Sequence, residues 1–242
     1  MKDTIRVLLD EFVRKTLVPF TESDVSKYLL KKKHPCSSDK IREYLQSSSN
    51  VLFNYNAGKI LSENDLPIKY AGFSPCFRKE AGAAGRDTRG IVRIHQFNKV
   101  EQYIYCTPEQ SDEMHEHLLN NLCEIMQDFE LPYRVIAACT GDMGFNKVKM
   151  HDVEAWFPSE NTYRELGSCS SIGQFQARRT NTRYRASDGS MQFCATLNNT
   201  GIALPRAIVP VIENHQNPDG SVNIPQKLQP LMGGRTKIGG KH

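Results

Sequence analysis

The strand-like segments that follow residue 51 constrain the fold of this chain more than any other feature. They are rich in Ile, Val, Tyr and Phe, which is typical of β-strands. In chain order they are Ile68–Phe77, Ile91–Cys106, Tyr133–Ala138, Asp152–Phe157, Arg164–Ser168 and Met191–Leu197. Two clear helices interrupt them at irregular intervals, whereas a parallel sheet would need regular alternation of strand and helix. The sequence therefore predicts an α+β fold with an antiparallel sheet.

The two helices have recognisable starts. Thr107-Pro108-Glu109-Gln110 places Thr as cap, Pro in the first turn and Gln three residues after the cap. This helix is expected to run to about Phe129 and to bury Leu118, Leu122, Ile125 and Met126. The second helix is expected to span about Ile202–His215. Pro205 is tolerated in its first turn, but Pro210 should kink or distort it.

Residues 1–50 are expected to form a separate helical segment, because apolar residues recur there with helical spacing. Hydrophobic residues make up 39% and charged residues 24% of the 242 residues, which is ordinary globular usage. No apolar run approaches the roughly 18 residues of a membrane helix. The N-terminus carries acids inside its apolar stretch, unlike a secretory signal. We therefore expect a cytoplasmic protein with no membrane partner.

The cysteine and histidine patterns do not favour a metal site. The seven cysteines are scattered and odd in number, and no C-x-x-C pair occurs. This spacing argues against a disulfide framework and against a standard zinc site. His115-Glu116-His117 lies in a strongly helical stretch, where residues two apart point to different faces. A solvated helix surface is the expected interpretation of this triplet.

A charged stretch around residues 78–101 is the strongest chemical signal. Arg78 and Glu80 are two apart on a strand and share a face, where they could bind a phosphate and an amine or form a cross-strand ion pair. The following loop has three glycines and two arginines. Beyond it, alternate positions on the expected strand carry Arg93, His95, Phe97, Lys99 and Glu101. Such a face suits a phosphate-rich ligand with a flat ring, on which Phe97 could stack.

These residues resemble a known family. The string CFRKEAGAAGRDTRGIVRIHQFNKVEQ (76–102) closely resembles motif 2 of class II aminoacyl-tRNA synthetases in its seryl-specific form. Further segments of the seryl enzymes are matched in order by residues 142–171, 176–184, 196–216 (motif 3) and 222–234. The resemblance covers about residues 51–238, and the chain is identified as a member of the seryl-tRNA synthetases.

The resemblance implies that residues 51–242 form a catalytic core with a six- or seven-stranded antiparallel sheet flanked by helices. It also implies a reaction in which serine and ATP form seryl-adenylate and serine then passes to the 3′ end of its tRNA. ATP and Mg²⁺ are the expected cofactors, and serine and tRNA are the expected partners.

Site residues carried over from the family fall into five groups. The catalytic residues would be Arg78, Glu165 and Arg206. ATP would be bound by Arg78, Lys79, Glu80, Ile94, His95, Gln96, Phe97, Glu165, Leu166, Gly167, Ser168 and Arg206. Serine would be bound by Arg78, Glu101, Asn198 and Thr200. Magnesium would be held by Glu165 and Ser168, and the tRNA acceptor end would meet Arg86 and Arg89.

Single residues of this set also have ordinary structural interpretations. Taken alone, Glu165 would more often be a surface acid and Asn198 a turn residue. Trp156 is expected in the core, and the pair Arg178–Arg179 is expected to support the fold.

The sequence also departs from the family pattern. We expect the N-terminal coiled-coil arm that recognises the serine tRNA to be missing, since residues 1–50 hold no extended heptads. Motif 1, which builds the family's dimer interface, is not found, so a homodimer or pairing with a full-length synthetase stays open. The family's Thr-x-Glu element falls near Ser47-Ser48-Ser49. Loss of its carboxylate should weaken serine binding by about 1–3 kcal/mol or more.

Three functions remain open from the sequence. The first is a serine–tRNA ligase core. The second is a non-catalytic paralogue that binds ATP or a full-length synthetase and regulates it. The third is a ligase that loads an activated amino acid onto a carrier other than tRNA.

Overall fold

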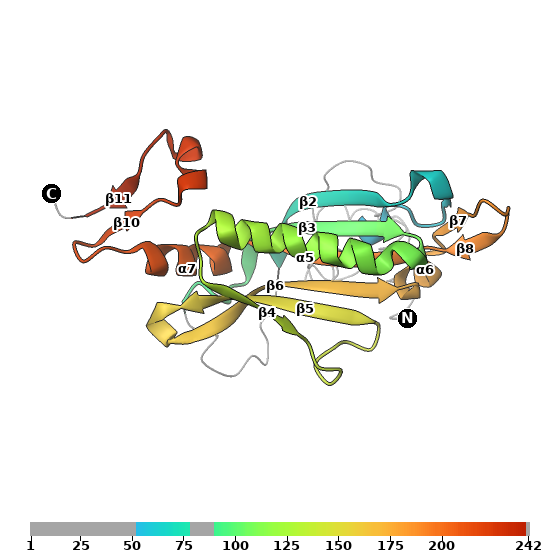
Figure 1. Cartoon of the computed structure of the whole chain (residues 1–242), viewed down its shortest axis with the longest axis horizontal. Coiled ribbons are helices and arrows are strands. Elements are labelled where there is room, and N and C mark those ends of the chain that lie inside the picture. Colours follow the sequence, from blue (N-terminus) through green and yellow to red (C-terminus); the bar gives the residue numbers. More distant parts are fainter. Residues whose placement is uncertain (1–51, 78–89, 241–242) are drawn as a thin grey trace, which may run out of the picture.

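The computed structural model describes residues 52–77 and 90–240, and its centre is a six-stranded sheet (Figure 1). The strand order is β2-β3-β9-β6-β5-β4, and every neighbouring pair is antiparallel. The bounds are β2 Ile68–Phe77, β3 Gln96–Cys106, β4 Tyr133–Ala137, β5 Lys149–Phe157, β6 Thr162–Gly173 and β9 Ala195–Ala203. The predicted α+β fold with an antiparallel sheet is confirmed.

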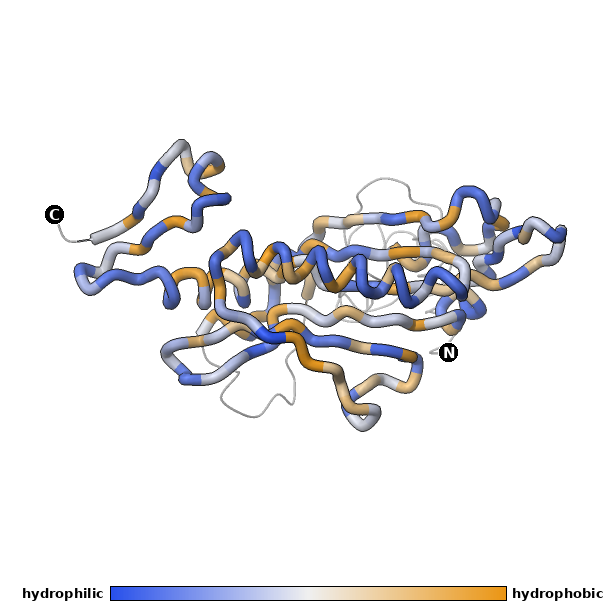
Figure 2. Tube along the Cα trace, viewed as in Figure 1, coloured by the Kyte–Doolittle hydropathy of each residue, from blue (hydrophilic) through white to orange (hydrophobic). Residues whose placement is uncertain are grey.

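Helix α5 (Ser111–Asp128) lies along one face of this sheet (Figure 1). It follows the short 3₁₀ helix η3 (Pro108–Gln110), where the Gln110 side chain accepts a hydrogen bond from the Thr107 backbone at 3.0 Å, as the sequence predicted. In Figure 2 the helix alternates between hydrophilic and hydrophobic residues along its length. Its apolar side packs on sheet residues such as Val153 and Leu197 to form the main core. Leu118, Leu122 and Met126 are buried as expected, whereas Ile125 is only partly buried.

Helix α7 (Leu204–His215) follows β9 directly. It begins two residues later than predicted, because Ile202 and Ala203 still pair with β3. Pro205 lies in the first turn, and the helix continues through Pro210. The start of α7 therefore lies directly at the end of β9, where β9 still pairs with β3.

Other predicted boundaries were also wrong, and β5 for example begins at Lys149 and not at Asp152. Strand β3 begins at Gln96 and not at Ile91, so residues 90–95 lie outside the sheet and Arg93 and His95 do not continue the alternating strand face. Strand β6 continues to Gly173, well beyond Ser168. The single strand expected over 191–197 is split between two sheets, because the chain changes pairing partners there.

The second sheet has the order β1-β7-β8. Its strands are β1 Ile60–Ser62, β7 Arg183–Arg185 and β8 Met191–Phe193. A smaller core lies between it and the central sheet, formed by Leu66, Tyr103, Tyr105, Ala177, Tyr184 and Cys194. The remaining elements are α6 Phe175–Thr180, η1 Glu63–Asp65, η4 Pro158–Glu160, β10 Ser221–Asn223, η5 Gln226–Leu228, η6 Pro230–Met232 and β11 Lys237–Gly239.

Two predictions of exposure were also wrong. His115 is fully buried, since it lies on the side of α5 that faces the sheet and its Nε2 contacts His151 Nδ1 on β5 at 2.8 Å. Trp156, expected in the core, is only partly buried and meets Tyr163 edge-on across two strands. Within the described residues, no helix is long and apolar enough to cross a membrane. Residues 1–50, predicted to be helical, lie outside the described residues.

Candidate active site

A bulge in β6 places two candidate ligands on one face of the sheet. The pairing of β6 with β5 shifts by one residue after Glu165, which leaves Leu166 as an extra residue. In a regular strand, residues three apart point to opposite faces. Because of the extra residue, Glu165 and Ser168 both lie on the face opposite α5, which we call the second face. Gly167 between them faces α5.

The absence of a side chain at Gly167 allows this arrangement. A Cβ atom there would lie 2.8 Å from Leu122 Cδ2 of α5 and 2.9 Å from the carbonyl oxygen of Thr200 on β9. Real Cβ atoms do not approach other atoms so closely. Gly167 was predicted to contact ATP. That contact stays a prediction, and the structure shows that the residue permits the close approach of β6, β9 and α5.

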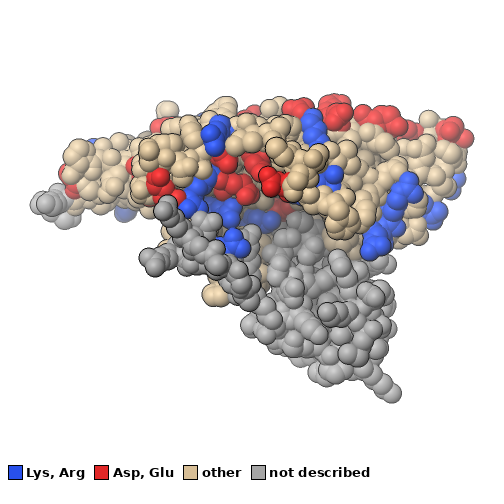
Figure 3. Space-filling view, turned by 90° about the horizontal axis from the view of Figure 1, so that it is seen from below, with Lys and Arg blue, Asp and Glu red and all other residues tan. Residues whose placement is uncertain are grey.

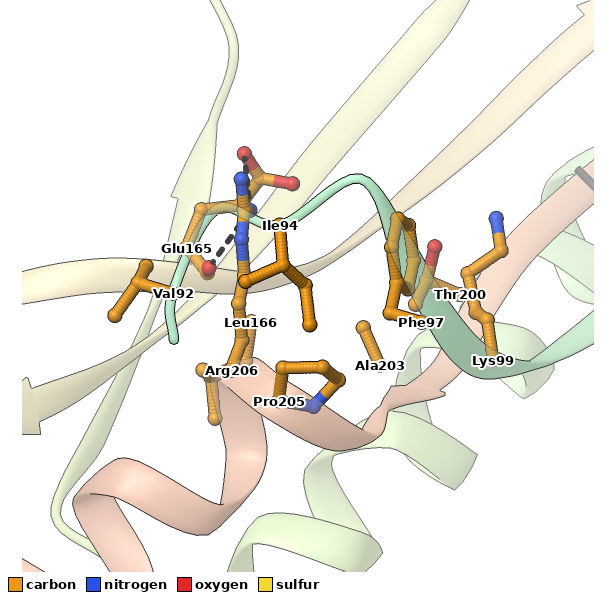
Figure 4. Close-up of a pocket in the computed structure, with 10 residues that line it drawn as sticks. All are labelled: Val92, Ile94, Phe97, Lys99, Glu165, Leu166, Thr200, Ala203, Pro205 and Arg206. Atoms are coloured by element: carbon orange, nitrogen blue, oxygen red, sulfur yellow. Dashed lines mark hydrogen bonds and ion pairs between the residues drawn. The ribbon is translucent and has the colours of Figure 1, made fainter. Parts of the chain in front are cut away.

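A pocket opens beside the bulge, where β3, β6 and the start of α7 meet (Figure 4). Its lining residues are Val92, Ile94, Phe97, Lys99, Glu165, Leu166, Thr200, Ala203, Pro205 and Arg206. In Figure 4 the Phe97 ring and the Arg206 side chain stand on opposite sides of the pocket, with Ile94 between them. An apolar wall with an aromatic ring and a guanidinium group suits a flat ligand that carries negative charge.

Arg206 is held in position by Glu165. Its Nη1 donates a hydrogen bond to the Glu165 carbonyl oxygen at 3.2 Å and lies 3.6 Å from the carboxylate Oε2. The Glu165 side chain is 45% exposed and that of Arg206 is 23% exposed. A guanidinium group has five N–H donors in all. Arg206 therefore keeps N–H groups that can donate hydrogen bonds to a phosphate.

A buried carboxylate lies next to the pocket on the second face. The Glu101 side chain is only 1% exposed and pairs with Lys99 Nζ at 2.5 Å. Asn198 Nδ2 donates a hydrogen bond to Glu101 Oε1 at 3.0 Å, and Thr200 is the direct strand partner of Glu101. The three predicted serine-binding residues that are described are thus brought together. Lys99 is a fourth member to which the sequence assigned no role.

A network of side-chain hydrogen bonds lies beside this cluster, further along β3 and β9. The Tyr103 hydroxyl donates to Gln176 Oε1 at 2.6 Å, and Thr196 Oγ1 donates to the same atom at 3.0 Å. Burial raises the pKa of Tyr103 above its ordinary value, so its hydroxyl stays protonated and keeps donating. Sequence patterns missed Gln176, because only the fold brings α6 against strands β3 and β9.

Other predicted site residues lie elsewhere. His95 and Gln96 are exposed and do not line the pocket. The residues expected to grip ATP and serine from motif 2 and to meet tRNA lie outside the described residues, namely Arg78, Lys79, Glu80, Arg86 and Arg89. The Ser47–Ser49 segment also lies outside them.

The oxygen donors on the second face fit a magnesium ion that is bound together with a nucleotide. Ser168 Oγ is buried with no hydrogen-bond partner among the described residues, and Glu165 offers a half-exposed carboxylate. Within those residues, no group of three or more His, Cys, Asp or Glu side chains could hold a metal by itself. Mg²⁺ commonly takes one or two protein oxygens and completes its coordination with water and substrate phosphates.

Acidic and basic side chains lie intermixed across the middle of the face seen in Figure 3. The described residues on this face do not form a single basic surface. Among the described residues, ligand charges would therefore be met by individual side chains such as Arg206 and Lys99.

The sheet and its pocket define a class. The chain belongs to the class II tRNA synthetases, since the family model described as "tRNA synthetase class II core domain (G, H, P, S and T)" matches residues 39–215. Similar curated proteins are serine–tRNA ligases. That of Deinococcus radiodurans is 54% identical over 185 residues, which are 76% of this chain and 44% of that protein. That of Bdellovibrio bacteriovorus is 51% identical over 196 residues, covering 81% and 46%.

Solved structures give the same result. The seryl-tRNA synthetase of Pyrococcus horikoshii complexed with ATP has a TM-score of 0.77 and 46% identity, covering 81% of this chain and 44% of that one. The cytoplasmic serine–tRNA ligase of Naegleria fowleri in complex with AMP has a TM-score of 0.76 and 40% identity, covering 81% and 46%. The chain therefore spans less than half the length of these relatives.

Proposed function

We propose that this chain is a serine–tRNA ligase core that activates serine with ATP and transfers it to the 3′ end of tRNA. The observation that carries the proposal is the pocket between Phe97 and Arg206, with Glu165 and Ser168 on the same face. Two structural relatives at 40% identity or above are complexes with ATP or AMP. A nucleotide in the pocket accounts for an aromatic wall, a guanidinium group and oxygen donors together.

In this proposal the chain binds and orients its substrates. Phe97 stacks on the adenine, and Arg206 holds the γ-phosphate. Arg78 holds the α-phosphate and the serine carboxylate, while Glu101 with Asn198 and neighbouring Thr200 receives the ammonium or hydroxyl group of serine. A planar guanidinium suits both anions because it donates in pairs.

The reaction needs no protein nucleophile. A serine carboxylate oxygen attacks the α-phosphorus, the bond to the β-phosphate oxygen breaks, and pyrophosphate leaves. The terminal tRNA hydroxyl then attacks the seryl carbonyl and AMP leaves. Holding the carboxylate and the phosphorus in line lowers the barrier by itself, because positioning replaces a bimolecular encounter. When bound, Mg²⁺ neutralises charge on the phosphates, and Glu165 and Ser168 would hold it.

The partners of the proposed enzyme follow from the same function. Arg86 and Arg89 would meet the tRNA acceptor end. A second copy of the chain or a full-length synthetase is a possible partner under the same proposal. We also propose a cytoplasmic location, where serine, ATP and tRNA are available together.

Serine-dependent exchange of pyrophosphate into ATP tests the proposal without tRNA. The wild-type chain should catalyse exchange only with serine present, and Arg206→Ala should lose it. Arg235→Ala removes the same charge at an exposed position outside the pocket and should retain wild-type exchange. ATP binding without exchange in the wild type would refute the ligase and favour the non-catalytic paralogue.

A further inference from the structure

Two polar atoms on neighbouring strands are buried without a hydrogen-bond partner among the described residues. They are Oδ1 of Asp152 on β5 and Oγ of Ser168 on β6. The two residues are direct partners across the strands. Side chains of such a pair share a face, and their Cβ atoms are about 4.5–5.5 Å apart. Asp152 therefore stands beside Ser168 on the second face, close to where the bulge places Glu165.

Within the part of the chain that the structure describes, the absence of a donor to Oδ1 distinguishes Asp152 from its neighbour Glu154. Glu154 lies on the same strand and face, but Arg134 Nε donates to its Oε2 at 2.7 Å. A buried carboxylate oxygen without a donor destabilises a fold and calls for a physical explanation. A ligand that brings hydrogen-bond donors into the site would explain why this oxygen has no donor from the described residues.

Water bound to a divalent cation is a donor of this kind. In nucleotide sites Mg²⁺ keeps several of its waters, and their hydrogens point away from the ion toward protein oxygens. Residues that accept hydrogen bonds from the ligands of a metal fix their orientation and raise the affinity for the ion. The sequence gives no sign of this role, because Asp152 lies within the matched segment 142–171 but is not among the site residues carried over from the family.

We propose that Asp152 is a positioning residue for the divalent cation, with its buried Oδ1 accepting a hydrogen bond from a cation-bound water beside Ser168. This inference rests on the proposed function, since Glu165 and Ser168 hold the cation there together with the ATP phosphates. Asp152 touches neither substrate. It orients the water molecules on the cation and thereby the phosphates that the cation binds.

The test measures binding of Mn²⁺ to the full chain in the presence of ATP, by the electron paramagnetic resonance signal of the free ion relative to the same ATP solution without protein. Asp152→Asn should raise the Kd for Mn²⁺ by about tenfold or more, as for other outer-shell partners. Asp142→Asn makes the same chemical change at an exposed loop position and should leave the Kd unchanged. Affinity for ATP without metal should be the same in all three proteins.

Stability and coupling separate this role from a structural one. Without metal, Asp152→Asn should melt no lower than the wild type, because the buried Oδ1 makes no hydrogen bond with the described residues that the change would remove. In a Ser168→Ala background it should raise the Kd much less than in the wild type. Asp152→Ala is the second variant if the Asn side chain disturbs packing.

The outcomes separate the inference from the function beneath it. Equal Mn²⁺ binding by wild type and Asp152→Asn would overturn the inference alone. A lower melting temperature with fully additive effects of the two substitutions would also overturn it, in favour of a structural role. Failure of the wild type to bind Mn²⁺ with ATP would overturn the inference and the proposed function together.

Discussion

Gly167→Ala should destabilise the chain and its site, because the added methyl group has no space. Its Cβ would lie 2.8 Å from Leu122 Cδ2 and 2.9 Å from the Thr200 carbonyl oxygen. The leucine side chain can rotate, but the backbone oxygen belongs to the central strand β9 and can move only with the sheet. Overpacking of this kind costs about 1–3 kcal/mol. Part of that is offset by about 0.4–1 kcal/mol, since alanine restricts the unfolded chain more than glycine does.

Thermal unfolding followed by circular dichroism measures the effect. For a chain of this size, 1 kcal/mol corresponds to roughly 2–4 °C in Tm, so a fall of several degrees is expected. Gly141→Ala is the matched control, because a Cβ there meets nothing within 4 Å and the backbone is unstrained. It should melt within about a degree of the wild type or slightly higher. Equal melting of the two variants would refute the argument that β6, β9 and α5 are in contact at Gly167.

Two further predictions concern the pocket and the buried histidine pair. Phe97→Ala should weaken ATP binding in calorimetry by roughly 5- to 150-fold, since base stacking on an aromatic ring contributes about 1–3 kcal/mol. Phe73→Ala, at an exposed ring on β2, should leave ATP binding unchanged, and equal effects of the two would contradict the stacking role. Burial, with Lys149 and His151 nearby, lowers the pKa of His115 from 6.5 to about 4. The unfolded chain therefore binds a proton that the folded chain does not between these values, and stability should fall by up to about 3 kcal/mol as the pH drops from 6.5 to 4. Urea unfolding across this range should show a weaker dependence for His115→Leu, and an unchanged dependence would exclude His115 as the group responsible.

The helices and strands that the sequence predicted well are those whose formation depends on the pattern of neighbouring residues. Helix α5 shows its cap at Thr107 and its buried stripe through Leu118 and Leu122 in the periodicity alone. Strand β2 was predicted with the bounds that the structure has, because its enrichment in Ile, Tyr and Phe is typical of a strand. Family resemblance then supplied Phe97, Glu165 and Arg206, which the structure brings to one pocket.

The features that the sequence did not predict depend on contacts between distant segments. The strand alternation of Phe97 and Lys99 continues back to Arg93 in the sequence, but residues 90–95 have no strand partner. His115 looked like a surface residue because its neighbours are polar, and only β5 packed against α5 buries it. The bulge at Leu166 depends on the register of two strands, so the sequence could not show why Glu165 and Ser168 share a face.

Formation of seryl-adenylate is the most direct test of the central claim that this fold activates serine. The purified chain would be mixed with ATP labelled at the α-phosphate, serine and pyrophosphatase, and quenched after a single turnover. The account predicts labelled seryl-adenylate in an amount close to that of the enzyme, dependent on serine and lost in Arg206→Ala. Labelled ATP that binds but is never converted would contradict the account and leave a nucleotide-binding protein without ligase activity.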